Sequence, residues 1–573
     1  MLSHMRSLFS ISVFAILSLC WQPVIAQTSS TQEAKPGTIS GRVVNESGRP
    51  LPNANVSAMR WGLMQSQNIQ TSTDREGKFE LTGLEPVNYQ IFAYRQGYVA
   101  LLRDLDETQP TVYRAGDSVT LVLTKGGVIT GTVTNQAGEP IVGLNVRALP
   151  VHVAPRSAYV YHRIAQRNLT DDRGVYRIYG LPEGTYFVWA GGGGEQNFGS
   201  QIDPFADDVP TYAPASTRDT AQEIVVRAGA ETNGVDIQYR GGSGHAVSGN
   251  ARGPDGTKLP GFAIFMISAG GPHWQARSSQ GPDDRGFSFQ GVDDGDYSVN
   301  AVSQTPDGAL LFSEPKQIKV RGADVTGVEL IVQPLSSVAG RVILEETKTA
   351  ECSDKQRPVF TDTLVSAQTS GMPATQWFLS TAATADERGN VLLKNLMPGR
   401  YYFTTQYFAK EWYLKSLTLA PPETANTKAG KPLDAARTWT TLKAGDRLNG
   451  LMITLAQGAA SLRGRITLNE GETVAEKMYV YLVPAEKEAA DSPLRFYIAR
   501  VTAEGKVSLN NLAPGRYLVF AQQATESVSP LTKLRSPDET AYRLKLRRAA
   551  ETVKTEIELK PCQTLTDVKV TTR

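Results

Sequence analysis

The chain has 573 residues, 40% of them hydrophobic and 20% charged, so it is long enough for several domains of ordinary soluble composition. Its formal net charge of +2 provides no field that would favour nucleic acid or an acidic membrane as a partner. Lysine and arginine occur in short pairs and never in a run, which excludes a basic binding tail as well.

The first 26 residues are typical of an export signal. Arg6 supplies a positive charge, Leu8–Trp21 is apolar, and Ala26 is the kind of small residue after which signal peptidases cut. We therefore expect cleavage between Ala26 and Gln27, and an exported mature chain with no further membrane span. Residues 27–36 are polar and rich in serine and threonine, which predicts a flexible leader.

A strand–turn–strand unit occurs five times and defines the organisation of the chain. The clearest copy, TDDRGVYRIYGLPEGTYFVWA from Thr170, has an Asp-x-x-Gly turn, an alternating strand, a Gly-Leu-Pro turn and a second strand. The copies begin at Thr73, Thr170, Pro282, Ala385 and Thr502. Each follows an opening strand with a recurrent glycine, namely Gly41, Gly131, Gly249, Gly340 and Gly464. The spacing leaves room for about six or seven short strands per copy, so we predict an all-β chain of about five small antiparallel sandwiches.

The predicted sandwiches, called modules 1 to 5, follow one another through very short linkers. Their expected bounds are residues 37–125, 126–241, 242–335, 336–457 and 458–573. Short linkers should bring neighbouring modules into contact at their ends, which predicts an elongated rod or arc. In module 5, Tyr542–Leu559 is interpreted as the closing strands, with Ala-Ala in place of the Ala-Gly of the other modules. No segment beyond the export signal has the apolar spacing of a long amphipathic helix.

Modules 2 and 4 are longer than the others because each carries an insert at the same place, residues 191–222 and residues 407–437. Loops of this length are usually functional or disordered, and disordered segments are poor in aromatic residues. The inserts and their surroundings contain five aromatic candidates for ligand binding, Phe205, Tyr212, Trp412, Tyr413 and Trp439. Two interpretations stay open, because these rings could bind a glycan or the inserts could pack over their own sandwiches.

Five tyrosines recur at the start of the strand after the Gly-Leu-Pro-type turn. They are Tyr89, Tyr186, Tyr297, Tyr401 and Tyr517. A buried tyrosine normally finds a hydrogen-bond partner. We therefore predict that each ring is buried with its hydroxyl bonded to nearby backbone.

The complete pattern resembles the carboxypeptidase regulatory-like domain. It consists of the opening Gly-x-Val/Ile, a Gly-Pro turn, Asp-x-x-Gly, Gly-Leu-x-Pro-Gly-x-Tyr and a closing hairpin, and it extends over roughly residues 37–561. The resemblance implies transthyretin-like sandwiches, related to the carbohydrate-binding-like fold, with a mostly accessory role. Module 5 departs from the pattern, because Thr502 stands where the turn aspartate belongs.

The catalytic residues of a zinc carboxypeptidase are missing from the sequence. No histidine is followed three residues later by glutamate, and neither a Gly-x-Ser-x-Gly motif nor a P-loop occurs. The acidic turns hold one or two carboxylates each, whereas calcium needs six to eight oxygen ligands. We therefore predict no enzymatic activity, no cofactor and no bound metal.

The three cysteines suggest one disulfide bond. Lipid attachment to Cys20 is an alternative to simple signal cleavage, but Leu19 replaces the small residue that such signals need. Cys352 and Cys562 remain after export, and a lone pair in an oxidising compartment is more often bonded than free. Two unpaired thiols are the alternative.

Two classes of function remain on the sequence alone. The first is a non-catalytic secreted or envelope protein with a structural or protein-interaction role, whose partner would be another envelope protein. The second is a carbohydrate-binding protein that uses the aromatic residues of the inserts. Both place the mature chain in the periplasm, outside the cell or on its surface.

Overall fold

The structure is a computed structural model of the chain. It describes residues 37–61, 69–100, 111–151, 168–192, 204–205, 208–259, 261–268, 286–306, 308–347, 352, 357–369, 381–420, 431–467, 474–475, 477–524 and 530–572. The predicted export signal, its cleavage site at Ala26 and Gln27, and the leader at 27–36 lie outside these residues.

Module 1 shows the strand arrangement that recurs along the chain. Its strands are β1 (Gly37–Asn45), β2 (Asn55–Arg60), β3 (Ile69–Ser72), β4 (Lys78–Leu84), β5 (Tyr89–Tyr94), β6 (Tyr98–Ala100) and β7 (Ser118–Lys125). One sheet has the order β4-β1-β7-β6 and the other β3-β2-β5. In β4 the residues Phe79 and Leu81 point into the core between the sheets while Lys78 and Glu80 face water, as alternation predicts.

Module 2 repeats this plan with its insert between two neighbouring strands. Its elements are β8 (Gly127–Thr134), β9 (Asn145–Pro150), β10 (Asn168–Leu169), β11 (Val175–Leu181), β12 (Gly184–Ala190), β13 (Thr211–Tyr212), the 3-10 turn η2 (Arg218–Thr220), β14 (Ile224–Val226), β15 (Glu231–Thr232) and β16 (Ile237–Gln238). The opening strand β8 lies between β11 and the pair β15 and β16, and β9 and β12 form the centre of the second sheet.

Module 3 joins its two sheets through one shared strand. Its elements are β17 (His245–Arg252), η3 (Pro254–Gly256), β18 (Phe262–Ser268), β19 (Phe287–Val292), β20 (Gly295–Gln304), β21 (Leu310–Ser313), β22 (Lys316–Val320) and β23 (Val325–Pro334). Because β21 pairs with both β20 and β23, the strands form a continuous path.

Module 4 uses part of its insert as a regular strand. Its elements are β24 (Ser336–Glu345), η4 (Phe360–Asp362), β25 (Leu364–Thr369), β26 (Ala382–Thr384), β27 (Asn390–Leu396), β28 (Gly399–Gln406), β29 (Trp412–Leu419), β30 (Leu433–Asp434), β31 (Thr440–Leu442) and β32 (Arg447–Gln457). The insert strand β29 pairs antiparallel with β32 at the edge of the first sheet.

Module 5 departs from the sequence prediction. Its elements are β33 (Ala460–Thr467), β34 (Met478–Pro484), η6 (Pro493–Arg495), β35 (Tyr497–Arg500), β36 (Lys506–Leu512), β37 (Gly515–Gln523), α2 (Pro530–Arg535), η7 (Pro537–Glu539), α3 (Thr540–Val553), β38 (Glu556–Leu559) and β39 (Thr564–Thr571). Most of the segment expected as closing strands is thus the helix α3. Its buried face consists of Arg543, Leu546, Ala549 and Ala550, and one arginine with two alanines does not produce the apolar stripe of a helix.

The sheets also differ from the expected purely antiparallel pairing in one respect. In every module the opening strand is antiparallel to the first strand of the repeated unit and parallel to the last strand. In module 4, for example, β24 is antiparallel to β27 and parallel to β32. The fold class is otherwise the predicted one of small β-sandwiches.

The recurrent opening glycines are explained by a close backbone approach. A Cβ atom on any of them would lie within 3.0 Å of a main-chain oxygen on the last strand of the same sandwich or, in module 2, on the segment between β15 and β16, closer than real Cβ atoms come. The pairs are Gly41 with Val119, Gly131 with Val235, Gly249 with Val328, Gly340 with Leu451 and Gly464 with Val568. In modules 1 and 3 to 5 the parallel pairing passes directly through these residues, so the two strands could not pair around a side chain.

Replacement of Gly249 by alanine should lower the unfolding free energy of module 3 by about 2–3 kcal/mol, because the obstructing atom belongs to the backbone and cannot rotate away. Gly261→Ala in the same module is the matched control, since nothing lies within 4 Å of the added methyl group. Urea unfolding of the two variants measures the difference. Equal stability of both would contradict the steric explanation.

The prediction for the recurrent tyrosines is confirmed. All five rings are buried. Four hydroxyls donate to the carbonyl oxygen four residues earlier, at 2.7 Å for Tyr186, 2.9 Å for Tyr297 and Tyr401, and 2.8 Å for Tyr517. The hydroxyl of Tyr89 instead accepts from the amide of Glu85 at 3.0 Å. The tyrosine therefore closes the turn that precedes its own strand.

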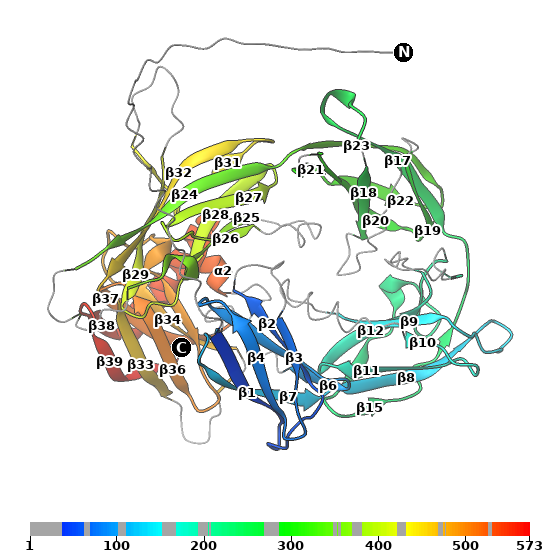
Figure 1. The fold of residues 1–573 in the computed structure, drawn as a ribbon, viewed down its shortest axis with the longest axis horizontal. Coiled ribbons are helices and arrows are strands. Elements are labelled where there is room, and N and C mark those ends of the chain that lie inside the picture. The colour runs from blue at the N-terminus through cyan, green and yellow to red at the C-terminus, as the bar shows by residue number, and fades with distance from the viewer. Residues whose placement is uncertain are drawn as a thin grey trace, which may run out of the picture.

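The modules form an arc that closes on itself. Figure 1 shows the chain passing through modules 1, 2 and 3 and returning, so that module 4 lies beside module 1. The ion pair of Arg114 with Asp362 and the ring contact of Trp61 with Phe408 join these two modules. An arc was one of the two expected shapes, but an extended array is wrong, because linker length does not reveal contacts between modules that are distant in sequence.

Candidate functional site

The contact between modules 1 and 4, here called the closing contact, has a polar centre. Asp362 in η4 has only 5% of its side chain exposed and forms an ion pair with Arg114 of module 1. Arg114 also donates through Nε to Oδ1 of Asn88 at 2.9 Å, and Asn88 is itself buried. A buried carboxylate is costly without a partner. The arginine therefore both neutralises Asp362 and fixes it to module 1.

Aromatic rings flank this polar centre. Trp61 of module 1 is 7% exposed and its ring meets the edge of Phe408 in the module 4 insert, with ring centroids 5.8 Å apart and an interplanar angle of 75°. The amide of Trp61 donates to the carbonyl oxygen of Asn88 at 2.9 Å, so the ring and the polar group are held by the same backbone. Edge-to-face pairs of this kind add stability beyond the area that they bury.

A cleft of about 960 Å³ opens beside the closing contact. Module 1 contributes Arg60 and residues 83–87, and module 4 contributes Leu344, residues 357–361 and Glu387. Arg60 is paired with Glu85 at 3.1 Å, inside module 1. The walls therefore combine apolar side chains with charges at the rim.

The two sides of the closing contact should be energetically coupled. A double-mutant cycle with Arg114→Ala and Asp362→Asn is expected to give a coupling free energy of about 1–2 kcal/mol in urea unfolding, since one partner is buried and the other is partly exposed. The matched control is the cycle for Arg60 and Glu85, an exposed pair beside the same cleft, which should give less than about 0.5 kcal/mol. Coupling no larger than in the control would contradict the closing contact.

The insert of module 2 lies at the boundary with module 3. Tyr212 is buried and its ring stacks on Trp189 at 5.7 Å, and the ring of Phe205 meets the edge of Tyr239 at 6.0 Å. The amide of Val209 donates to the carbonyl oxygen of Gly242 at 3.0 Å, which ties the insert to the start of module 3.

Charged side chains lie at the boundary between modules 2 and 3. Burial raises the pKa of Asp293 in module 3, whereas the hydrogen bond that the amide of Asp294 donates to its carboxylate lowers it. Arg240 at the end of module 2 also lowers the same pKa. Electrostatic interactions therefore cross from module 2 to module 3.

The insert of module 4 lies at the boundary with module 5. Asn511 donates through Nδ2 to the carbonyl oxygens of Ala409 and Trp412, at 2.6 and 2.8 Å. Trp439 donates through Nε1 to Oδ1 of Asp538 at 2.7 Å. These bonds join the start of the insert, and a residue just after its end, to module 5.

Two arginines also lie at the boundary between modules 4 and 5. The guanidinium of Arg400 lies 4.9 Å from the ring centroid of Trp439, and its Nη2 lies 3.5 Å from Asp538. Burial lowers the pKa of Arg535 in α2, while the hydroxyls of Tyr497, Tyr407 and other tyrosines act to raise it. Helix α2 of module 5 thus brings one cation, Arg535, to tyrosines of module 4.

A disulfide bond adds a covalent link between the same two modules. Cys352 follows the first strand of module 4 and Cys562 precedes β39, and the structure joins them with their Cα atoms 5.2 Å apart. The bond closes a loop of 210 residues.

One family model matches the chain. Residues 38–120 match the carboxypeptidase regulatory-like domain, which covers nearly all of module 1. Module 1 is thus similar in sequence to the carboxypeptidase regulatory-like domain. A search of curated proteins found no match for the chain.

Solved structures that resemble the chain include two bacterial proteins. The TIE protein of Bacillus anthracis is 12% identical, with a TM-score of 0.14, over 70% of this chain and 69% of that one. The minor pilin GBS52 of Streptococcus agalactiae is 11% identical, with a TM-score of 0.19, over 36% of this chain and 96% of that one. At such TM-scores the likeness carries no argument about function.

Module 1 contributes Trp61, Asn88 and Arg114 to the closing contact, and no sequence motif singles them out. Phe408 and Asp362, their partners in module 4, are equally unmarked in the sequence. The one available signal is the position of Phe408 inside an insert that the sequence does identify. Side chains that meet only through the packing of distant modules leave no periodic pattern.

The five aromatic candidates do not form one platform. Tyr212 and Trp412 are buried, at 5% and 2% exposure, so neither can present its face to a sugar, which corrects the interpretation of these two as ligand-binding residues. Phe205, Tyr413 and Trp439 are half-buried; the first lies in module 2 and the other two lie in module 4. The physical reason is that the inserts bury their aromatic side chains in the sandwiches and at module boundaries.

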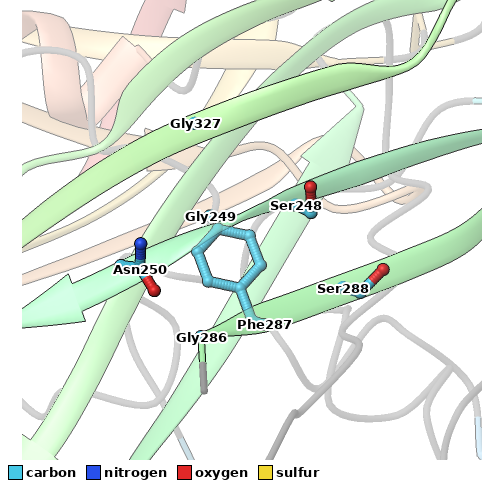
Figure 2. A pocket seen from close by; sticks show the side chains of 7 residues that line it. All are labelled: Ser248, Gly249, Asn250, Gly286, Phe287, Ser288 and Gly327. Carbon is cyan, nitrogen blue, oxygen red and sulfur yellow. The ribbon is translucent and has the colours of Figure 1, made fainter. Parts of the chain in front are cut away.

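Figure 2 shows a second depression, of about 550 Å³, in module 3. It is lined by Ser248, Gly249, Asn250, Gly286, Phe287, Ser288 and Gly327, none of them charged. The depression surrounds the opening glycine Gly249, so it results from the close approach of β17 and β23. Among the residues that the structure describes, no group of three or more His, Cys, Asp or Glu is arranged to hold a metal ion. No helix in those residues has the length and apolarity needed to cross a membrane.

Proposed function

We propose that the protein is a non-catalytic, exported scaffold whose modules are locked into a closed arc for structural and protein-interaction roles. The proposal rests on the contacts that the longest segments outside the sandwiches make. The inserts of modules 2 and 4 and the helices of module 5 contact neighbouring modules. A chain that needed only linked, independent sandwiches would not require these contacts.

The proposed location rests on the N-terminal residues and the cysteines. Residues 1–26 have the composition of an export signal with cleavage after Ala26, and the bond between Cys352 and Cys562 requires an oxidising compartment. Both are satisfied in the periplasm, outside the cell or on its surface. Another envelope protein is the proposed partner.

The absence of catalysis is proposed from the sequence. The chain lacks the His-x-x-Glu pair of a zinc peptidase and the motifs of other common hydrolases. The regulatory-like domain of module 1 belongs to a family that we take to be mostly accessory. The carbohydrate-binding alternative loses support, because two of its five aromatic residues are buried.

Small-angle scattering on the mature protein tests the proposal. A closed arc has a smaller radius of gyration than five modules in a line, and the double variant Trp61→Ala with Arg114→Ala should increase it by opening the closing contact. An extended wild-type particle would overturn the closed arc. Hydrolysis of peptides or glycans by the purified protein would overturn the non-catalytic role, and micromolar binding on a glycan array would favour the alternative.

A further inference from the structure

The dipeptide Asn-Gly occurs twice in the chain, as Asn233-Gly234 in module 2 and as Asn449-Gly450 in module 4. Both copies lie just before the residue that faces the opening glycine, so they occupy the same place in the fold. An asparagine side chain can cyclise onto the backbone nitrogen of the next residue, and glycine hinders this attack least because it has no Cβ atom. The two copies therefore place the same reactive group in two different surroundings.

The backbone of the first copy stands outside the strand ladder. Asn233 and Gly234 are exposed and lie between β15 and β16. The carbonyl oxygen of Thr130 accepts from the amide of Val235 at 3.1 Å, so the chain bulges outwards at Gly234. Within the described residues, neither the carbonyl of Asn233 nor the amide of Gly234 makes a backbone hydrogen bond, and nothing lies within 4 Å of a Cβ atom added to Gly234. The peptide group that joins them is therefore free to rotate towards the side-chain amide.

Neighbouring strands hold the second copy in place. Asn449 and Gly450 belong to β32, which lies between β24 and β29. The carbonyl oxygen of Gly450 accepts from the amide of Ala420 at 3.0 Å, and a Cβ atom added to Gly450 would lie 2.7 Å from that of Ala420. Asn449 is exposed, as Asn233 is. Access of water therefore does not distinguish the two copies, whereas the freedom of the backbone does.

We propose that Asn233 is a modification site that deamidates spontaneously and thereby weakens module 2, whereas the sheet protects Asn449. The nitrogen of Gly234 attacks Cγ of Asn233, the bond from Cγ to the side-chain nitrogen breaks, and ammonia leaves with the proton of the attacking amide. Water then opens the resulting succinimide at either carbonyl, which gives aspartate or isoaspartate and a new negative charge. The reaction needs no reagent other than water, and it does not depend on the proposed scaffold role.

Isoaspartate would disturb the contact that the opening glycine makes, because it adds a carbon atom to the main chain ahead of Val235. The carbonyl oxygen of Val235 lies against Gly131, and Oδ1 of Asp236 accepts from the amide and the hydroxyl of Thr132, both at 2.8 Å. Just before the bulge, β15 is already paired with β8. The segment between these fixed points has no room for a longer backbone. The modified module should therefore open more readily at β8.

Peptide mapping by mass spectrometry tests the proposal on the full mature protein, incubated in mildly alkaline buffer. Asn233 should convert at least about tenfold faster than Asn449, because β32 must open locally before its backbone can rotate. In concentrated urea the two sites should react at similar rates, since only the local sequence then differs. A rate at Asn233 no higher than that at Asn449 in the folded protein, or a ratio that persists unchanged in urea, would overturn the proposal.

Asn233→Gln is the matched variant, because its longer side chain cyclises far more slowly. Hydrogen exchange of the amides in β8 should be faster in incubated wild type than in fresh wild type, with β17 of module 3 unchanged. The incubated variant should exchange as slowly as the fresh variant. Equal exchange in fresh and converted wild type would overturn the effect on module 2, and so would faster exchange in the incubated variant.

Discussion

Replacing Cys352 and Cys562 by serine is expected to lower the unfolding free energy of modules 4 and 5 by about 5 kcal/mol. The bond closes a loop of 210 residues, and the entropy that a cross-link removes from the unfolded chain increases with loop length. The double variant keeps the remaining contacts at the boundary, including Asn511 with Ala409 and Trp412. The loss should therefore appear as a lower urea midpoint for these modules and not as a change in fold.

The control for this prediction is chemical reduction. Reduced wild-type protein should unfold at the same urea concentration as the double serine variant, and either single variant should match both. Modules 1 to 3 serve as an internal reference, because they lie outside the loop. If oxidised wild type and the double variant shared one midpoint, the contribution of the bond to stability would be refuted.

Replacement of Tyr401 by alanine should cost module 4 about 3–5 kcal/mol, the usual penalty for truncating a buried aromatic side chain. The ring is 1% exposed and belongs to the core between the two sheets. Its hydroxyl also donates to the carbonyl oxygen of Met397 at 2.9 Å, so the variant leaves that acceptor without its donor. Urea unfolding measures the loss, and a change below about 1 kcal/mol would contradict the role of the ring.

Tyr401→Phe separates the hydroxyl from the ring. It should cost only about 1 kcal/mol, since it removes one hydrogen bond and keeps the apolar surface. Burial raises the pKa of Tyr401 to about 12, against an ordinary value of 10.0. Its contribution to stability should therefore be complete below pH 10 and decline as the pH rises towards 12, because the unfolded tyrosine ionises first. The phenylalanine variant should lack this component of the pH dependence.

Local features of the fold could be predicted from the sequence because they depend on neighbouring residues. The turn aspartates illustrate this, since Oδ1 of Asp171 accepts the amides of Arg173 and Val175, two and four residues later. The opening glycines and the recurrent tyrosines act within one sandwich, so each copy repeats the same signal. Because each pattern is repeated along the chain, it could be recognised without any comparison between proteins.

The segment that forms helix α3 was predicted as strands, and the error has a physical reason. Arg543 is 1% exposed and donates to the carbonyl oxygens of Leu534 and Ser536 at 3.2 and 2.7 Å. A charged residue that is buried by hydrogen bonds to a preceding turn looks like a surface residue in a periodicity analysis. The alternating polar and apolar residues around it then imitate a strand.

The closing contact could not be predicted at all. Arg114 lies just before the last strand of module 1, and Asp362 lies in a short turn of module 4. Each is an ordinary charged loop residue in its own neighbourhood. Only the cumulative rotation from one module to the next brings them together, and that rotation is set by many side chains at the boundaries between modules.

The disulfide bond also determines how tension would pass through the protein. When the two ends of the chain are pulled apart, force reaches Cys352, crosses to Cys562 and continues into β39, so the residues between the cysteines are not stretched. At about 3.3–3.6 Å per extended residue, the bond prevents the loop from adding roughly 700 Å to the length of the stretched chain. Modules 4 and 5 thus transmit pulling force from module 3 to β39 while most of their backbone remains unloaded.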